Sequence, residues 1–201
     1  VKKQSRFRVI YGPIRASDIR TFLKNGKKAD KQMRQVTFTM YERFILTPVE
    51  IQTVLKPALI TAFVLLLLAG IGPGIFSISG VLQRGGISIL ALAAGIFAGA
   101  FVTPVLLPFI PSRKFALKGL IAGSIVALLP LLMAAPAVNG MAGYLALFLF
   151  STTISSYLAM NFTGATPFTS PSGVEKEMKQ YIPVQLASLV ISFGLWIYSA
   201  F

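Results

Sequence analysis

The stretch "ALITAFVLLLLAG", Ala58 to Gly70, contains no charged residue and only one hydroxyl group, that of Thr61. An α-helix needs about 20 mainly apolar residues to cross a bilayer, and the apolar run that includes this stretch covers about 57–77. Similar runs follow at about 86–109, 116–136, 141–161 and 182–201. The sequence therefore predicts a mainly α fold, with a five-helix transmembrane bundle over 47–201.

The overall composition supports a membrane protein. Hydrophobic residues make up 55% of the 201 residues, and the mean hydropathy is +0.74. Of the 19 Lys and Arg residues, 13 lie at or before Lys56, and no acidic residue falls between Ile51 and Val174. A basic segment next to an anionic membrane surface explains this charge more simply than nucleic acid does. We therefore expect the lipid bilayer, and no nucleic acid, as a partner.

The basic residues between the spans predict the orientation. Arg84 alone lies in the first connection, and the third connection, 136–140, has no charge. The other two connections are basic, with Arg113, Lys114 and Lys118 in the second and Lys176 and Lys179 in the fourth. Because basic connections stay in the cytoplasm, we expect a multi-pass protein of the cytoplasmic (inner) membrane, with its N-terminus cytoplasmic and its C-terminus outside.

The residues before the bundle, 1–46, read as the end of a soluble domain and a linker. Alternation predicts strands at 6–11 ("RFRVIY") and, as a strand or an extended linker, at 35–41 ("QVTFTMY"). Between them we expect a helix over 16–23, with Ser17 as a possible cap and Gly26 at its left-handed end, and a short helix over 29–34. "TPVE", Thr47 to Glu50, has the pattern of a capping box and is expected to begin the first membrane helix.

Three features of the spans concern packing or a site. Gly95 with Gly99, and Gly119 with Gly123, are small-xxx-small pairs that we expect to pack within the chain, with a dimer contact as the alternative. The hydroxyls of "FSTTISSYLAMN", 150–161, are expected to serve packing, with a polar track as the alternative. The loop that follows is unusually long, and Ser172 with Glu175 is expected to cap the last helix. We consider this loop a candidate docking surface for a soluble domain through Asn161, Thr163, Gly164, Thr166 and Thr169.

The chain has no Cys and no His. It therefore supplies no disulfide, no zinc or iron–sulfur ligand set and no Ser-His dyad, and we expect no metal site in it. The sequence does not begin with Met, and we expect it to be the C-terminal portion of a larger protein.

Three stretches together resemble one family: "YGPIRASDIRTFLKNG", "MRQVTFTMYERFILTPVEI" and "NFTGATPFTSPSGVEKEM". The first two resemble the end of the corrinoid-binding domain that is shared with the large subunit of the corrinoid iron–sulfur protein of the acetyl-CoA pathway. The third, together with five spans, resembles the membrane-bound corrinoid proteins of microbial mercury methylation. The resemblance covers nearly the whole chain.

The resemblance implies a cytoplasmic, Rossmann-like α/β domain that binds cobalamin, of which this chain holds only the last strand and helix elements. It implies a methyltransferase that transfers a methyl group from methyl-cobalamin to Hg(II), and a ferredoxin-like partner with two [4Fe–4S] clusters. A Cys on a cap helix faces the cobalt in that family. It is expected upstream, so no catalytic residue is assigned here and we expect the chain alone to be inactive.

Ligands of open α/β sheets bind beyond the carboxyl ends of the strands. Gly12, Pro13, Ile14 and Arg15 follow such an end and are therefore our candidate cobalamin contacts, although Arg15 would equally serve to tie the turn to its domain. Two alternatives stay open for the function. One is a membrane transporter or channel subunit with a basic cytoplasmic head, and the other is a corrinoid membrane methyltransferase with an acceptor other than mercury.

Overall fold

The computed structural model describes residues 9–134, 138, 140–162 and 170–201. The chain divides into two compact units, Val1–Thr39 and Met40–Phe201, and each is described by itself. The division falls several residues before the predicted boundary at 46/47, because the first long helix already begins at Met40.

The first unit consists of short helical turns. A 3-10 turn, η1 (Ala16–Asp18), leads into α2 (Ile19–Lys24), and a second turn, η2 (Gln32–Arg34), follows the loop. The helix predicted over 16–23 is thus confirmed, and Gly26 has the predicted left-handed backbone with φ +64°. The expected cap is wrong, because Ser17 lies inside η1 and its side chain makes no capping bond.

No strand forms among the described residues of the first unit. Residues 9–11 and 35–39 have no sheet partner, and 40–41 already belong to the next helix; residues 6–8 lie outside the described part. The buried apolar side chains of this unit are Phe22 and Met33. The predicted α/β character is thus not observed in the described residues of this unit.

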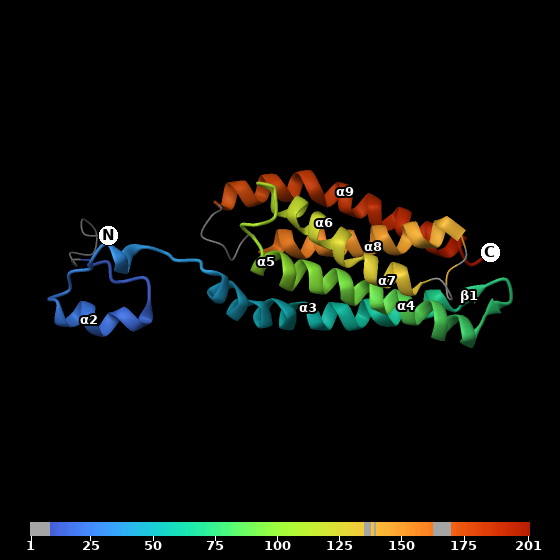
Figure 1. Ribbon diagram of the computed structural model, residues 1–201, viewed down its shortest axis with the longest axis horizontal. Coiled ribbons are helices and arrows are strands. Elements are labelled where there is room, and N and C mark those ends of the chain that lie inside the picture. The colour runs from blue at the N-terminus through green and yellow to red at the C-terminus, as the bar shows by residue number, and fades with distance from the viewer. Residues whose placement is uncertain (1–8, 135–137, 139, 163–169) are drawn as a thin grey trace. The chain divides into compact units, whose positions relative to one another are not determined.

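The second unit contains five helices that are long and apolar enough to cross a membrane (Figure 1). They cover Met40–Ala69, Ile78–Val105, Phe115–Met133, Gly140–Asn161 and Ser172–Tyr198, among the described residues. Each of the five predicted spans overlaps one of these helices, so the prediction of five spans is confirmed at this level. The ends of the helices differ from those predicted.

The first of these helices, α3 (Met40–Ala69), is continuous through "TPVE". The predicted capping box is therefore wrong. The Thr47 hydroxyl instead donates to the Phe44 carbonyl at 2.7 Å. Pro48 has no N–H to bond to that carbonyl four residues earlier, so Thr47 replaces the missing donor and the helix continues.

A two-stranded antiparallel hairpin, β1 (Ile71–Gly72) and β2 (Ile75–Phe76), connects α3 to α4 (Ile78–Ile96). Ser77 caps α4 by accepting from the Gly80 amide. The helix then widens into a π-helical segment, η3 (Phe97–Val102), before α5 (Thr103–Val105). The Thr103 hydroxyl donates to the Ala98 carbonyl, five residues earlier, at 2.8 Å.

The third span is broken into α6 (Phe115–Val126) and α7 (Leu128–Met133), and the fourth is α8 (Gly140–Asn161). The last helix, α9 (Pro171–Tyr198), is capped by Ser170, which accepts from the Gly173 amide at 3.2 Å. The predicted cap at Ser172 is thus wrong by two residues. With Ser170 as the cap, Pro171 occupies the first helical position, where its missing N–H costs nothing.

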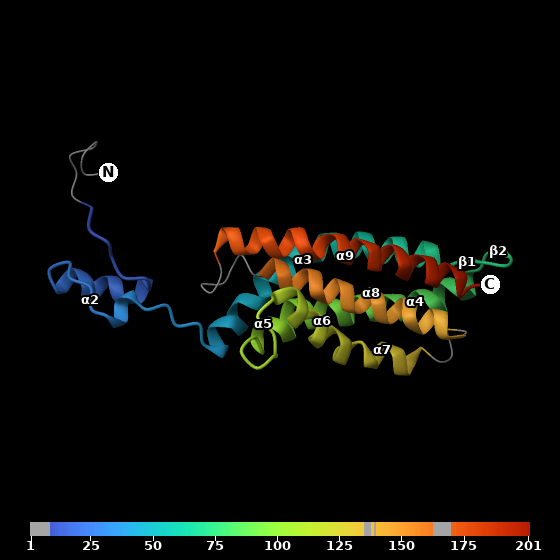
Figure 2. The ribbon, with the colours of Figure 1, turned by 90° about the horizontal axis from the view of Figure 1, so that it is seen from above.

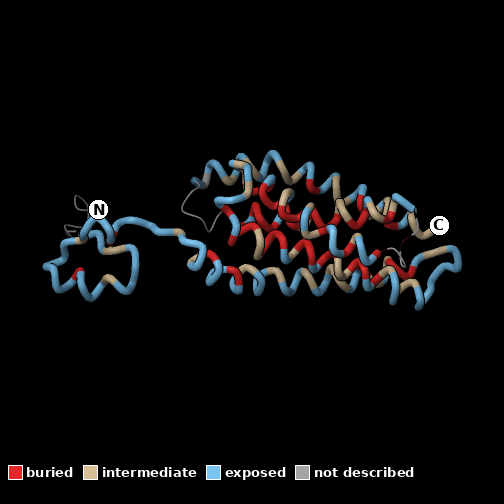
Figure 3. The backbone as a smooth tube through the Cα atoms, in the orientation of Figure 1, coloured by how far each residue is buried: buried red, intermediate tan, exposed pale blue. Residues whose placement is uncertain are grey.

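Helix α8 is the centre of the bundle. It packs against α4, α6 and α9, and Figure 2 shows it between α9 on one side and α6 and α7 on the other. In Figure 3 the buried residues, coloured red, gather toward the inside of the bundle. By contrast, α3 and α9 are exposed along most of their length, as expected for helices that face lipid.

The two glycine pairs allow α4, η3 and α6 to pack closely against α8. A Cβ atom added at Gly95 or Gly99 would lie 2.7 or 2.6 Å from the carbonyl oxygens of Ser151 and Ser155 on α8. Added at Gly119, it would lie 2.5 Å from the Ser155 carbonyl oxygen, and at Gly123, 2.7 Å from the Ser155 Cβ. Both pairs therefore pack within the chain, as predicted.

Candidate functional site

The predicted cofactor-contacting turn, Gly12 to Arg15, is held by contacts within the first unit. The Ile14 amide donates to the Met33 carbonyl at 2.9 Å. Gly12 lies against the buried Phe22 ring, where an added Cβ would be 3.8 Å from the nearest ring carbon. The turn is thereby fixed to α2 and η2, which gives it a defined position.

An open cavity of about 520 Å³ lies beside this turn. Its lining includes Gly12 and Ile14 from the predicted set, together with Tyr11 and two cations, Lys27 and Arg34. The sequence analysis missed the two cations. Lys27 follows Gly26, and both have left-handed backbones, with φ +63° and +64°. This reversal brings Lys27 to the turn, and the "KNGKK" pattern, 24–28, is a signal that could have predicted it.

The other two predicted residues do not line this cavity. Arg15 donates a hydrogen bond from its guanidinium to the Thr37 hydroxyl, which ties the turn to segment 35–39. This contact corresponds to the alternative considered for Arg15, a structural tie. The structure thus brings together Gly12, Ile14, Lys27 and Arg34, with Pro13 and Arg15 outside the lining of the cavity.

The predicted docking loop is described only at its edges. Asn161 is the exposed last residue of α8. Thr163, Gly164, Thr166 and Thr169 lie outside the described residues. The docking role of this loop therefore stays a prediction.

The hydroxyl groups of α8 serve packing. The Ser155 hydroxyl donates to the Gly119 carbonyl at 2.6 Å. Two further bonds join α8 to α9: Thr153 with Ser188 at 2.7 Å, and the Gln185 amide to the Ser156 hydroxyl at 2.9 Å. Bonds of this kind join helices in lipid. A continuous polar track across the bundle is not needed to explain these residues.

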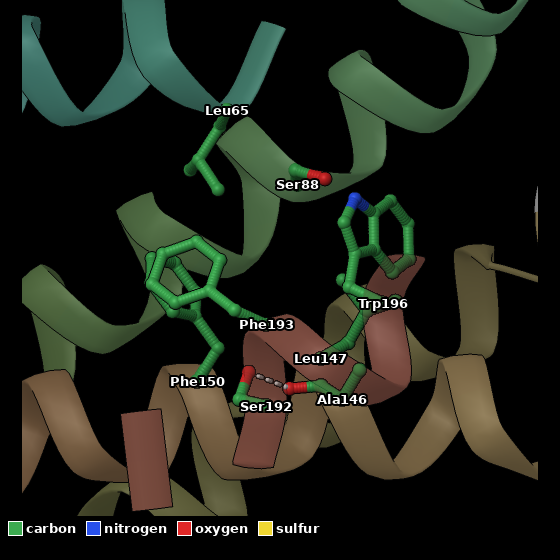
Figure 4. A pocket seen from close by; sticks show the side chains of 8 residues that line it. All are labelled: Leu65, Ser88, Ala146, Leu147, Phe150, Ser192, Phe193 and Trp196. Carbon is green, nitrogen blue, oxygen red and sulfur yellow. Dashed lines mark hydrogen bonds between the residues drawn. The ribbon is translucent and has the colours of Figure 1, made fainter. Parts of the chain in front are cut away.

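A small, partly open space lies between α3, α4, α8 and α9. Figure 4 shows Trp196 of α9 and Ser88 of α4 on its wall, with the Ser192 hydroxyl bonded to the Ala146 carbonyl at 2.8 Å. The Trp196 indole N–H is buried there without a hydrogen-bond partner among the described residues. The volume of about 10 Å³ is close to the least that one water molecule needs, so this space is too small for a substrate.

Two basic residues that were predicted in loops lie within helices. Lys118 is in α6, is 8% exposed, and donates to the carbonyls of Leu107 and Ile110. Arg84 is in α4 and stacks on the Trp196 ring at 4.5 Å. Lys118 is thus a buried cation within the bundle, and Arg84 is half-buried. Both cations lie near helix ends and bond to carbonyls, which is how lipid-embedded cations are tolerated.

Within the described parts of the chain, no three acidic side chains gather as a metal-ligand cluster. Compared with models of protein families, with curated proteins and with solved structures, the chain has no significant match. Its function must therefore be inferred from its own residues. The structure gives two features for that purpose: the basic cavity beside Gly12, and a helical bundle with charges at its ends.

Proposed function

We propose that this chain is the membrane portion of a corrinoid-dependent methyltransferase that methylates Hg(II). The observation that supports the proposal is the joint occurrence of three family-like stretches, 11–26, 33–51 and 161–178, in a chain with five helices able to cross a membrane. The soluble subunit of the acetyl-CoA pathway shares only the first two stretches. The membrane helices therefore favour the mercury-methylating relatives.

The cavity beside Gly12 fits the edge of a corrinoid. Lys27 and Arg34 offer cationic donors, which suit a phosphate group, and the turn offers backbone groups for the amide side chains of the cofactor. Gly12, Ile14, Lys27 and Arg34 would hold this edge, and upstream residues would hold the rest. The bound corrinoid would supply the methyl group that is transferred to mercury.

The remaining parts of the reaction belong outside this chain. A cap-helix thiolate facing cobalt requires a Cys, and this chain has none. We place that Cys in upstream residues, and we place the re-reduction of the corrinoid on a ferredoxin-like partner with two [4Fe–4S] clusters. The bundle then anchors the cofactor domain in the cytoplasmic membrane.

The proposed topology has a direct test. At one end of the bundle, Lys114 donates to Gln180 at 2.6 Å and the Ala116 amide donates to Glu177 at 2.7 Å, which places the basic segments of α6 and α9 together. The positive-inside rule makes this end cytoplasmic. Single Cys substitutions at Arg113 and Lys176 should then react with an impermeant thiol reagent only from the cytoplasm, and one at Ser79 only from outside.

The background for this labelling is free of competing thiols, because the chain has no native Cys. Labelling of Ser79→Cys from the cytoplasmic side alone would contradict the assignment. Labelling of all three sites from one side would contradict a membrane crossing by Ile78–Val105, the span that separates Ser79 from Arg113.

The function is tested with the protein that includes the upstream domain, its ferredoxin-like partner, a corrinoid and Hg(II). Replacing both Lys27 and Arg34 with Ala should lower corrinoid affinity about tenfold or more, because a charge-assisted hydrogen bond contributes about 1.5–3 kcal/mol. The matched control is Lys28→Ala with Lys31→Ala, which removes the same charge away from the cavity. Methylmercury formation should fall with corrinoid occupancy.

The 201-residue chain alone should form no methylmercury. A full-length protein that binds no corrinoid would refute the proposal and favour the transporter alternative. A protein that binds corrinoid but leaves Hg(II) unmethylated would instead support a methyltransferase with another acceptor.

A further inference from the structure

A second cavity, of about 310 Å³, lies within the bundle unit between α3 and α8, with α4 beneath it. Helix α3 packs on α4, and also on η3 and α5, the two segments that follow α4 in the chain. Its middle part stands apart from α8 and leaves a groove. The α3 wall includes Thr53, Pro57 and Ala58, and the α8 wall includes Tyr157 and Asn161.

The groove is polar at the end near Asn161 and mainly apolar beyond it, with Thr61 as the one hydroxyl residue at the far end. On α8 it runs from Asn161 back to Ile154, and on α3 from Thr53 to Thr61. At 1.5 Å per residue, either wall is about 10–12 Å long. Leu92 and Ile96 of α4 line it as well. An apolar slot of this length, parallel to helices that cross a membrane, matches the direction and chemistry of an acyl chain.

The polar end offers complementary groups for a lipid head. Tyr157 and Asn161 are one helical turn apart on α8 and provide an O–H and an N–H₂ donor. Pro57 has no N–H, so the usual helical donor to the Thr53 carbonyl is missing at this same place. Lys56 is exposed beside Pro57, and Lys side chains lie along apolar surface with their charge directed to the interface.

From these features we propose that the groove binds one phospholipid. Its acyl chain lies along Ala58, Leu92 and Ile154, its ester carbonyls accept from Tyr157 and Asn161, and its phosphate pairs with Lys56. An anionic lipid is preferred because of that lysine and the basic residues at the same end of the bundle. This inference concerns the bundle alone and does not rest on the proposed methyltransferase activity.

The test uses the full chain reconstituted in bilayers of phosphatidylglycerol and phosphatidylethanolamine, released into detergent and examined by native mass spectrometry. The wild type should retain one phospholipid. Ala58→Trp fills the groove. The fraction of protein that retains a phospholipid should therefore be about tenfold lower for Ala58→Trp than for Leu59→Trp. Leu59 is the matched control, since it is on the same helix but 64% exposed.

A second variant keeps the groove empty and removes only its donors. Tyr157→Phe combined with Asn161→Leu should lower retention about three- to tenfold while gel filtration and far-UV circular dichroism stay unchanged, since each hydrogen bond contributes about 1 kcal/mol. Lys56→Gln should abolish the preference for phosphatidylglycerol over phosphatidylethanolamine. Equal retention by Ala58→Trp and Leu59→Trp, or a wild type that retains only detergent, would overturn the proposal.

Discussion

Replacing Gly119 with Val is expected to destabilise the bundle by about 3 kcal/mol or more, the upper range for overpacking a core. The first added carbon would lie 2.5 Å from both the Ser155 carbonyl oxygen and the Ala159 Cβ, on the central helix α8. Neither is the free end of a long side chain, so α6 would have to move away. That movement would also break the bond from the Ser155 hydroxyl to the Gly119 carbonyl.

Thermal unfolding in detergent, followed by circular dichroism, measures this effect. A loss of about 3 kcal/mol corresponds to a fall of about 6–12 °C in the unfolding midpoint for a domain of this size. Gly194→Val is the matched control, because an added Cβ there meets nothing within 4 Å, and it should change stability by no more than about 0.5 kcal/mol. Equal midpoints for the two variants would contradict the close packing of α6 on α8.

Arg84→Ala is expected to cost about 2–4 kcal/mol, the sum of several charge-assisted bonds less their desolvation. The guanidinium donates to the Trp196 carbonyl at 2.5 Å, to the Ser199 hydroxyl at 3.0 Å and to the Ile71 carbonyl at 3.3 Å. It also stacks on the Trp196 ring. One side chain thus joins α4 to the end of α9 and to the hairpin after α3.

The same unfolding measurement distinguishes the charge from the shape of this side chain. Arg84→Lys keeps the charge but lacks the planar fork, so it should recover only part of the loss. Arg113→Ala, in an exposed loop position, should have an effect below about 0.5 kcal/mol. A similar midpoint for Arg84→Ala and Arg113→Ala would show that the three contacts contribute nothing in detergent.

The five spans could be predicted from the sequence because a helix that crosses a bilayer needs about 20 mainly apolar residues, and such runs are visible in the sequence itself. It predicted the glycine contacts for the same kind of reason, since small residues four apart form one face of a helix. The ends of the helices were predicted less well. "TPVE" has every residue of a capping box, yet the structure uses Thr47 to compensate for Pro48 inside a continuous helix.

The contacts of the basic residues could not be predicted from local sequence. Arg84 and Trp196 are 112 positions apart, and Lys118 bonds to carbonyls that precede its own helix. Gly12 and Ile14, predicted as cofactor contacts from the strand-to-turn pattern, line the cavity, while their contact with a cofactor stays a prediction. Lys27 and Arg34 were missed because their approach depends on the chain reversal after α2.

The π-helical segment Phe97–Val102 has a consequence for helical phase. In a regular helix one inserted residue would turn every later residue by about 100°, since a turn holds 3.6 residues, but the wider π-helical turn takes up the extra residue and does not pass this rotation on. The π turn thus lets buried residues on both sides of it, Gly95 before and Thr103 after, face the inside of the bundle. A homologous sequence that is one residue shorter between Gly95 and Thr103 is therefore expected to form a regular α-helix there and to keep the residues that correspond to Gly95 and Thr103 buried.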